Sequence, residues 1–158
     1  MTFIELEKLL KERRSVRKFK RTPVSKSEVV RVLELARLAP SGANLQPGKL
    51  HVLTGDALDT LKSTLHEAVA TERPYVSQYS YFPQPMPAVL KTKQRAAGYA
   101  LYSALDINRR DTAGRREQFN QNYRFFDAPV GIVVTIHKDM GKGCFMDLGM
   151  AMMALFMA

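Results

Sequence analysis

Three arginines and a serine lie close together near the start of the chain, at Arg13, Arg14, Ser15 and Arg17. A planar guanidinium carries paired N–H donors that match a phosphate group or the electron-rich edge of a heteroaromatic ring. Ser15 adds a hydroxyl between these donors. The group could therefore bind a phosphate-bearing small molecule, although arginines that follow a helix are more often solvated surface charge, and both interpretations stay open.

A second polar group lies in the segment between Pro40 and Pro47, which contains Ser41, Asn44 and Gln46. Amide side chains both donate to and accept from the rim of a heteroaromatic ring. The two prolines and the small residues between them indicate a loop with a restricted backbone. Such residues also commonly serve only the loop itself, so the segment taken alone does not identify a site.

The remaining candidates for chemistry are isolated residues. The three histidines share no metal-ligand spacing, and Cys144 has neither a histidine nor a basic cluster beside it. No catalytic triad and no carboxylate pair can be recognised. We therefore expect no metal site, and no side chain of the sequence is assigned a catalytic role.

Hydrophobic periodicity predicts the elements that position these groups. Ser25 and Glu28 form a Ser-x-x-Glu capping box at the start of a helix that Pro40 should end. The β-branched run from Val130 to Ile136 indicates a buried strand. The expected elements are helices at 3–12, 25–39, 56–69, 96–105, 111–123 and 144–158 and strands at 50–54 and 130–136.

Residues 71–90 contain four prolines among several aromatic residues, which prevents a continuous helix or a central strand. We expect a covering loop there. It would be either a lid over an apolar site or a wrap that shields the core. The rest of the chain is expected to form a single domain over residues 1–158.

The last expected helix carries a methionine stripe formed by Met146, Met150, Met153 and Met157. The helix has no stop signal, and nothing follows the stripe that could cover it. Large exposed apolar surfaces usually mark an interface. The sequence therefore predicts that the chain self-associates through this helix.

Composition limits the class of protein. The chain has 158 residues, of which 46% are hydrophobic and 25% charged, and its net charge is +9. These values indicate a folded protein, and with one cysteine, no export signal and no apolar run of membrane-spanning length we expect a cytoplasmic protein without a membrane partner. The basic excess leaves polyanion binding as an alternative, but no helix-turn-helix, zinc-finger or RNP-type pattern supports nucleic acid as a partner.

Four segments together resemble the nitroreductase-like, FMN-dependent oxidoreductases. The sequences Glu-Arg-Arg-Ser-Val-Arg-Lys-Phe at 12–19 and Ala-Pro-Ser-Gly-Ala-Asn-Leu-Gln-Pro at 39–47 resemble the family's first two motifs. The strand at 51–55 and the entry to the later strand at 127–131 are similar to the family's as well. The proline- and aromatic-rich segment followed by residues 122–129 is most similar to the nitrobenzoate-type branch.

The resemblance implies an α+β fold with a central sheet flanked by helices, an obligate homodimer, and FMN bound at the subunit boundary. It implies that Arg13, Arg14, Ser15 and Arg17 contact the flavin's phosphate, ribityl chain and pyrimidine edge. Pro40, Ser41, Asn44 and Gln46 would come from the other subunit and meet the isoalloxazine. Asn122 and Arg124 lie near a position that adds flavin contacts.

The function implied is that of an NAD(P)H-dependent flavin oxidoreductase that reduces nitroaromatic, quinone or similar electron-poor small molecules. Two departures from the family's pattern stand out: Gly48 replaces an aromatic residue, and the family continues well beyond Ala158. The chain is therefore expected to lack the family's C-terminal part, and a catalytically weak or inactive flavin-binding homologue is the main alternative.

Overall fold

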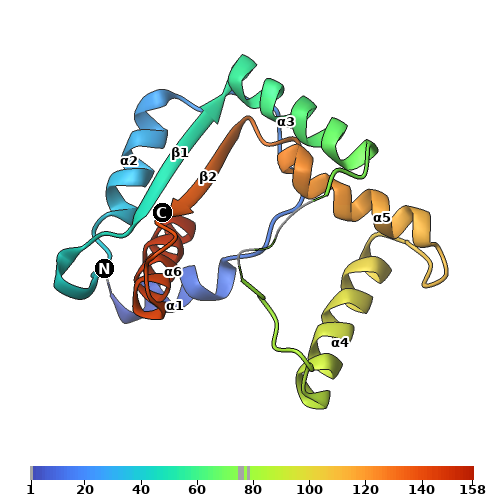
Figure 1. Cartoon of the computed structure of the whole chain (residues 1–158). Helices are drawn as coiled ribbons and strands as arrows, with labels where there is room; N and C mark the ends of the chain where they lie inside the picture. Colours follow the sequence, from blue (N-terminus) through green and yellow to red (C-terminus); the bar gives the residue numbers. More distant parts are fainter. Residues whose placement is uncertain (1, 75–76, 78) are drawn as a thin grey trace. The chain divides into compact units, whose positions relative to one another are not determined.

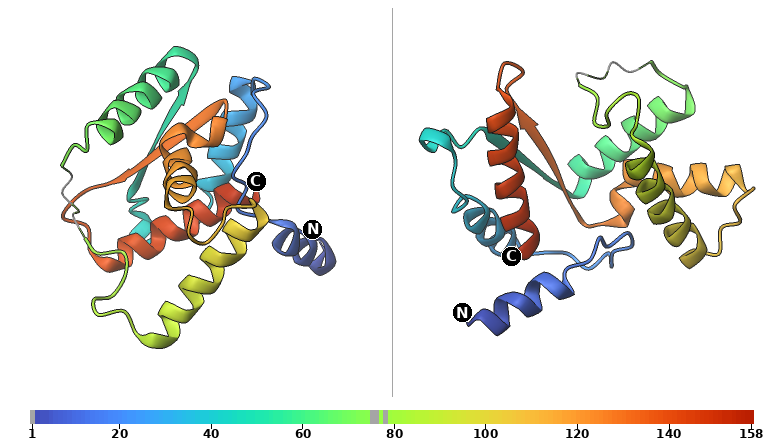
Figure 2. Two further views of the ribbon diagram at one scale, coloured as in Figure 1. Left: turned by 90° about the vertical axis from the view of Figure 1, so that its right-hand side faces the viewer. Right: turned by 90° about the horizontal axis from the view of Figure 1, so that it is seen from below.

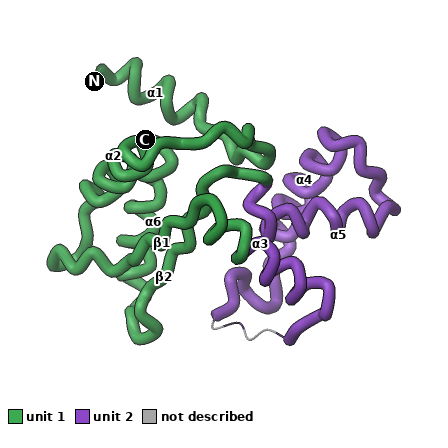
Figure 3. The backbone as a smooth tube through the Cα atoms, turned by 90° about the horizontal axis from the view of Figure 1, so that it is seen from above, with its two compact units in different colours: residues 1–60, 127–158 green, residues 61–126 purple. Residues whose placement is uncertain are grey.

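The computed structural model describes residues 2–74, 77 and 79–158 (Figure 1). The chain divides into two compact units, one made of residues 1–60 and 127–158 and the other of residues 61–126 (Figure 3). We call them unit 1 and unit 2 and describe each by itself. That the whole chain forms a single domain stays a prediction.

Unit 1 contains a sheet, the helices that pack against it and one separate helix. Its two strands pair in antiparallel fashion, with a register that runs from Gly48 opposite Ile136 to Thr54 opposite Val130. Both predicted strands are confirmed, and the first begins two residues earlier than expected. The expected burial of the strand at 130–136 was wrong, because the sheet has two strands in the described part of the chain and leaves Val133 exposed on one face. The elements of unit 1 are α1 (Phe3–Glu12), α2 (Lys26–Ala36), η1 (Gly42–Asn44), β1 (Gly48–Thr54), the start of α3 (Gly55–Ala70), β2 (Val130–Ile136) and α6 (Lys142–Met157).

The two faces of the sheet differ. Residues at alternate positions of a strand point to the same side, so Gly48 and Leu50 of β1 share one face, and both line a cavity together with residues of α2 and α6. On the other face, the imidazole Nε2 of His51 lies 2.9 Å from the hydroxyl of Thr135. His51 is thus engaged in a cross-strand contact, as a structural histidine would be.

α2 is fixed at its start by the predicted capping box. The hydroxyl of Ser25 accepts a hydrogen bond from the backbone N–H of Glu28 at 3.2 Å, and the backbone N–H of Ser25 donates to the Glu28 carboxylate at 2.9 Å. The helix packs against α6 and buries Ala36, which is 1% exposed. Packing and capping therefore act on the same short helix.

The expected end of α2 was wrong. The helix ends at Ala36 rather than continuing to Pro40, because the amides of Leu38 and Ala39 bond only three residues back, with Leu38 N–H donating to Leu35 O at 3.1 Å. This tighter turn changes the direction of the Leu38 side chain, which is 78% exposed.

α1 is an independent element of unit 1. It also begins with a capping box, formed by Thr2 and Glu5, but none of its residues is buried. Both views of Figure 2 show α1 standing away from the two strands. Its first apolar residues, Phe3 and Ile4, are 80% and 74% exposed.

Unit 2 is helical in its described part. It contains the rest of α3, α4 (Ala88–Ala104), α5 (Thr112–Asn120) and η2, whose bounds are Gln121–Asp127 and whose last residue belongs to unit 1. The predicted break at residues 108–110 is confirmed.

Two expectations for unit 2 were wrong. α4 begins directly after Pro87, so residues 88–90 of the expected covering loop are helical, because no proline follows to interrupt them. The helix expected at 111–123 ends at Asn120 instead of Tyr123. Phe125 and Phe126 then take left-handed φ values of 54° and 51°. Tyr75, one of the aromatic residues of the expected loop, lies outside the described residues.

Within the described ranges, the helices are too short or too polar to cross a bilayer.

The two capping boxes give a matched pair of stability variants. Ser25→Ala should lower the free energy of unfolding by about 1 kcal/mol, because an N-cap side chain satisfies an otherwise unpaired amide. Thr2→Ala should leave the global transition nearly unchanged, since α1 buries nothing. Urea denaturation followed by circular dichroism measures both. Equal losses in the two variants would contradict the assignment of α1 as an independent element.

The Ser25→Ala variant also tests how stability depends on pH. The hydroxyl and then the backbone N–H of Ser25 bond the Glu28 carboxylate and lower its pKa. A lowered folded-state pKa stabilises the protein above the ordinary glutamate pKa, and that contribution is lost as the pH falls through the folded value. Ser25→Ala should therefore weaken the dependence of stability on pH in this acidic range.

Candidate functional site

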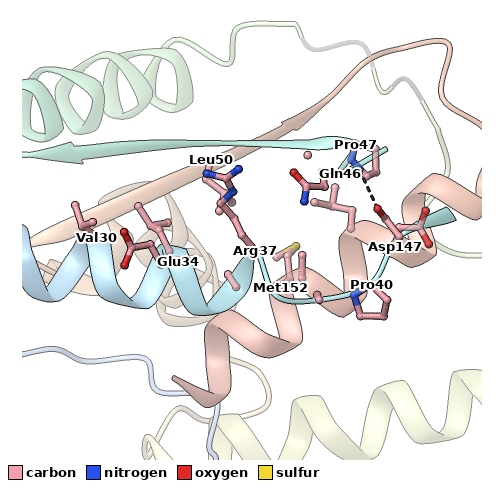
Figure 4. Close-up of a pocket in the computed structure, with 16 residues that line it drawn as sticks. Val30, Glu34, Arg37, Pro40, Gln46, Pro47, Leu50, Asp147 and Met152 are labelled. Atoms are coloured by element: carbon pink, nitrogen blue, oxygen red, sulfur yellow. Dashed lines mark hydrogen bonds between the residues drawn. The ribbon is translucent and has the colours of Figure 1, made fainter. Parts of the chain in front are cut away.

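A cavity of about 490 Å³ lies within unit 1, between α2, the loop at 40–47, β1 and α6 (Figure 4). We call it the loop cavity. Leu33, Leu50 and Met152 give it an apolar wall, whereas Gln46 and Asp147 lie together at one end (Figure 4). A mostly apolar cavity with a few convergent polar groups is typical of small-molecule sites.

The loop beside this cavity has an unusual backbone. Ala43, Asn44 and Gln46 have φ values of 49°, 56° and 46°, in the left-handed region that residues with a Cβ rarely adopt. Each such residue costs on the order of 1–3 kcal/mol unless its surroundings enforce the conformation. Strained segments of this kind cluster at ligand sites, so the backbone singles out the predicted loop.

Besides the backbone hydrogen bonds of its 3-10 turn, two bonds to side chains hold the loop in this shape. The hydroxyl of Ser41 accepts from the backbone N–H of Gln46 at 3.0 Å, closing the loop on itself. The carboxylate of Asp147, on α6, accepts from the backbone N–H of Gly42 at 3.1 Å. Ser41 therefore acts on the loop's shape, and Asp147 fixes the loop to the helix.

The amide side chains of the loop remain available to a ligand. Gln46 Nε2 donates to Asn44 Oδ1 at 3.3 Å, and both residues are exposed. Because that contact uses one donor of Gln46 and one acceptor of Asn44, the Gln46 carbonyl and the Asn44 NH₂ keep their bonding capacity. Pro40, Ser41 and Gln46 line the loop cavity, whereas Asn44 does not.

The arginine segment follows α1 as irregular, exposed chain. The guanidinium of Arg14 donates to the carbonyls of Lys11 and Arg13, and that of Arg17 donates to the Ser15 carbonyl at 3.2 Å. In the described part of the chain, no carboxylate pairs with Arg13, Arg14 or Arg17. The structure does not bring this segment into the loop cavity, so the two predicted halves of the site are separate within one chain.

The last two predicted site residues are in η2, within unit 2. Asn122 Nδ2 donates to the carbonyl of Phe119 at 2.6 Å. Arg124 pairs with Glu117 at 2.7 Å and lines a cavity formed by α3 and α5 residues. Both side chains are thus engaged in local contacts inside unit 2.

Asp147 is a functional candidate that lies outside the motifs recognised in the sequence. Its signal was nevertheless present, because Asp147 is the only charged residue from Gly143 to Ala158. A single carboxylate in an apolar helix needs a partner, and the partner is a backbone amide of the strained loop.

Gly48 also has a local explanation. A Cβ added at this position would collide with the side chain of Leu148, one helical residue beyond Asp147. The glycine therefore lets β1 approach α6 closely beside the loop cavity. The family's aromatic residue at this place, expected from the resemblance, would have to displace Leu148.

Sequence comparisons relate the chain to enzymes that act on nitro compounds. A model described as Nitroreductase family matches residues 10–158. The 4-nitrobenzoate reductase of Pseudomonas putida is 31% identical over 97% of this chain and 66% of that protein. The nitrobenzene nitroreductase of Ectopseudomonas oleovorans is 32% identical over 97% of this chain and 68% of that protein. The chain thus spans about two thirds of the length of these relatives.

Solved structures give the same relationship. The FMN and NADPH-dependent nitroreductase NfnB from Sphigopyxis sp. strain HMH superposes with a TM-score of 0.91 at 34% identity, over 96% of this chain and 68% of that one. The FMN-dependent nitroreductase NfnB from Mycobacterium smegmatis, solved in complex with NADPH, gives 0.89 at 32% identity, again over 96% and 68%.

The contact between Asp147 and Gly42 can be tested without any ligand. Asp147→Ala should speed amide hydrogen exchange at Gly42 and Gln46, because the strained loop loses its contact with α6. A hydrogen bond to a charged group contributes about 1.5–3 kcal/mol, which corresponds to roughly ten- to 150-fold faster exchange. Asp147→Asn keeps a carbonyl acceptor, so its exchange rate should lie between those of the unsubstituted chain and Asp147→Ala. Unchanged exchange in Asp147→Ala would mean that the loop holds its own shape.

Proposed function

Because the chain belongs to the nitroreductase family, whose fold it shares, we propose that it acts as an FMN-dependent oxidoreductase. In this proposal NAD(P)H is the reductant, and the acceptor is a nitroaromatic, a quinone or a similarly electron-poor small molecule. The expected α+β, nitroreductase-like fold is confirmed by the two solved structures.

One observation carries the proposal. The loop predicted to meet a flavin holds three left-handed residues and is fixed by Asp147. It exposes the amides of Asn44 and Gln46, and Gln46 lines the loop cavity with its apolar wall. An apolar surface bordered by amide donors and acceptors matches a heteroaromatic ring system, which is flat, largely apolar and polar at its rim.

The arginine segment supplies the complementary chemistry. Arg13, Arg14 and Arg17 have no carboxylate partner among the described residues, and Ser15 adds a hydroxyl. Such a donor set fits a phosphate monoester, which is what FMN carries and riboflavin lacks. We assign Arg13, Arg14 and Ser15 to the phosphate and ribityl chain and Arg17 to the pyrimidine edge.

The side chains of the site would bind FMN and adjust its reduction potential, while the bound flavin would supply hydride transfer between nicotinamide and acceptor. A cation at the pyrimidine edge favours the negatively charged reduced form, so Arg17 raises the reduction potential. Pro40, Ser41, Asn44 and Gln46 position the ring, with Asn122 and Arg124 as further contacts. No side chain is assigned as a proton donor, because solvent can supply that proton.

We also propose that the working form is a homodimer whose subunits complement each other's sites. The support is that the arginine segment lies outside the loop cavity of its own chain, and that Met146, Met150 and Met153 of α6 are 70%, 42% and 38% exposed. A partner subunit would cover this surface and bring its own loop to the arginines. With one cysteine in the chain, no intrachain disulfide is possible, and a cytoplasmic location fits that property.

The decisive experiment combines binding with turnover. The purified chain, titrated with FMN, should quench flavin fluorescence with a stoichiometry of one per subunit, whereas riboflavin should bind more weakly. NADPH or NADH oxidation should then depend on added 4-nitrobenzoate or a quinone. FMN binding without turnover would identify a flavin-binding homologue, and no binding of FMN would refute the proposal.

Arg17→Ala tests the assignment of the pyrimidine edge. A charge-assisted hydrogen bond contributes about 1.5–3 kcal/mol, so FMN affinity should fall roughly ten- to 150-fold and the flavin potential should fall with it. Lys20→Ala removes the same charge from the same segment and serves as the control. Equal effects of the two variants on affinity and potential would show that only general basicity matters.

The dimer is tested by Met150→Lys combined with Met153→Lys. Two charges on the proposed interface should shift the chain toward monomer in analytical ultracentrifugation and release FMN at the same time. Lys142→Glu, at the start of the same helix, serves as a control for a charge change outside the methionine stripe. A double variant that stays dimeric with FMN bound would place the interface elsewhere.

A further inference from the structure

Unit 2 contains a separate cavity of about 430 Å³ at the corner between α4 and α5. We call it the corner cavity. Its lining includes Tyr99, Tyr102 and Ser103 near the end of α4 together with Asn108, Arg109 and Arg115. The predicted site residues Asn122 and Arg124 are not among its lining residues, so the corner cavity is distinct from the positions assigned to the flavin.

Two arginines of this cavity are held over tyrosine rings. The guanidinium carbon of Arg109 lies 5.1 Å from the ring centre of Tyr99, and that of Arg115 lies 5.7 Å from the ring centre of Tyr102. The tyrosines are three residues apart on α4 and therefore lie on the same side of the helix. Each cation–π contact restrains a long side chain before any ligand arrives.

The positive charges of these arginines are not neutralised by the chain. Among the residues that the structure describes, no carboxylate forms an ion pair with Arg109 or Arg115. The Asp111 carboxylate nearby is committed to the start of α5, where it accepts from the N–H of Gly114 at 2.8 Å. Asp106 is the one acidic residue that lines the cavity, so the lining carries more positive than negative charge.

Neutral donors lie beside the arginines. Asn108 Oδ1 accepts from the backbone N–H of Arg110 at 2.9 Å. This bond orients the amide, and its NH₂ group remains free to donate to a ligand. The Ser103 hydroxyl, which also lines the cavity, is a further donor. The corner cavity thus combines two restrained guanidiniums with an amide and a hydroxyl, a set dominated by donors.

We propose that the corner cavity binds a phosphate monoester through Arg109 and Arg115. A phosphate monoester carries about −1.5 to −2 charge at pH 7 and accepts several hydrogen bonds, which matches two unpaired guanidiniums. Because Asp106 offsets part of the positive charge of the lining, the preference for a phosphate over a carboxylate rests on the larger number of acceptor oxygens that a phosphate offers to these donors. This inference does not depend on flavin binding elsewhere in the chain.

The first test uses inorganic phosphate and the whole chain. Isothermal titration at constant ionic strength, adjusted with chloride, should show one saturable site. Arg109→Gln and Arg115→Gln should each weaken it at least about tenfold, because each removes a charge-assisted hydrogen bond. Arg95→Gln removes the same charge from α4 outside the cavity and should change affinity less than twofold. No saturable site, or an equal loss in Arg95→Gln, would overturn the proposal.

A second test substitutes Tyr99 and leaves every charge of the cavity in place. Tyr99→Phe retains the ring beneath Arg109 and should bind phosphate as the unsubstituted chain does. Tyr99→Leu removes the ring and should weaken binding, because Arg109 must then be ordered by the ligand. Equal affinities in these two variants would contradict restraint by the ring, and this comparison remains valid if an arginine variant fails to fold.

Further titrations identify the source of the phosphate group. Adenosine 2′-monophosphate that binds more tightly than inorganic phosphate, with adenosine itself not binding, would identify a nucleotide. Displacement of inorganic phosphate by FMN, together with weaker FMN binding in Arg109→Gln, would identify the flavin. Binding of inorganic phosphate but of neither monoester would contradict the proposed class of ligand and identify a free-anion site. The first two results each support the proposal and assign the cavity one occupant.

Discussion

The candidate site depends on one hydrogen bond between distant parts of the chain, from the Gly42 amide to the Asp147 carboxylate. The loop at 40–47 contains left-handed residues that an isolated segment would not hold, and none of the three is glycine. The hydrogen bond to Asp147 on α6 stabilises this unfavourable backbone conformation and holds the loop in place. Because the same helix lines the loop cavity through Leu148 and Met152, the shape of the loop and the shape of the cavity are set together.

α6 therefore has two surfaces with different requirements. One packs on α2 and borders the loop cavity, while the other presents methionines to solvent. Burial inside the chain is slight: among the described residues only Ala36 and Leu58 are fully buried apolar side chains. A chain that buries so little of its own apolar surface gains little stability from packing. Additional surface against α6 would stabilise the helix and, through Asp147, the loop, so assembly and site formation are coupled.

Sequence patterns predicted the features that are local. The Ser25 capping box, the β-branched strand at 130–136 and the break at 108–110 depend on neighbours within a few residues, and all three are confirmed. The loop at 40–47 was recognised from its prolines and amides, but not its anchor, because Gly42 and Asp147 are 105 residues apart in the sequence. The left-handed conformation of Ala43 was equally hidden, since alanine carries no such signal. The end of α2 was missed because a tighter last turn replaced the expected helical one.

The two arginine groups differ in what must order them. Arg14 and Arg17 bond only to carbonyls of their own exposed segment, so a ligand or a partner subunit must supply the order and bear the entropy cost, which can reach about 2 kcal/mol for a long side chain. Arg109 and Arg115 already lie over tyrosine rings, and less freedom remains to be lost when an anion binds. Affinity at the first group should consequently follow the assembly of the protein. Affinity at the second should be a property of unit 2 alone, which makes the two kinds of anion site separable even though both are built from the same side chain.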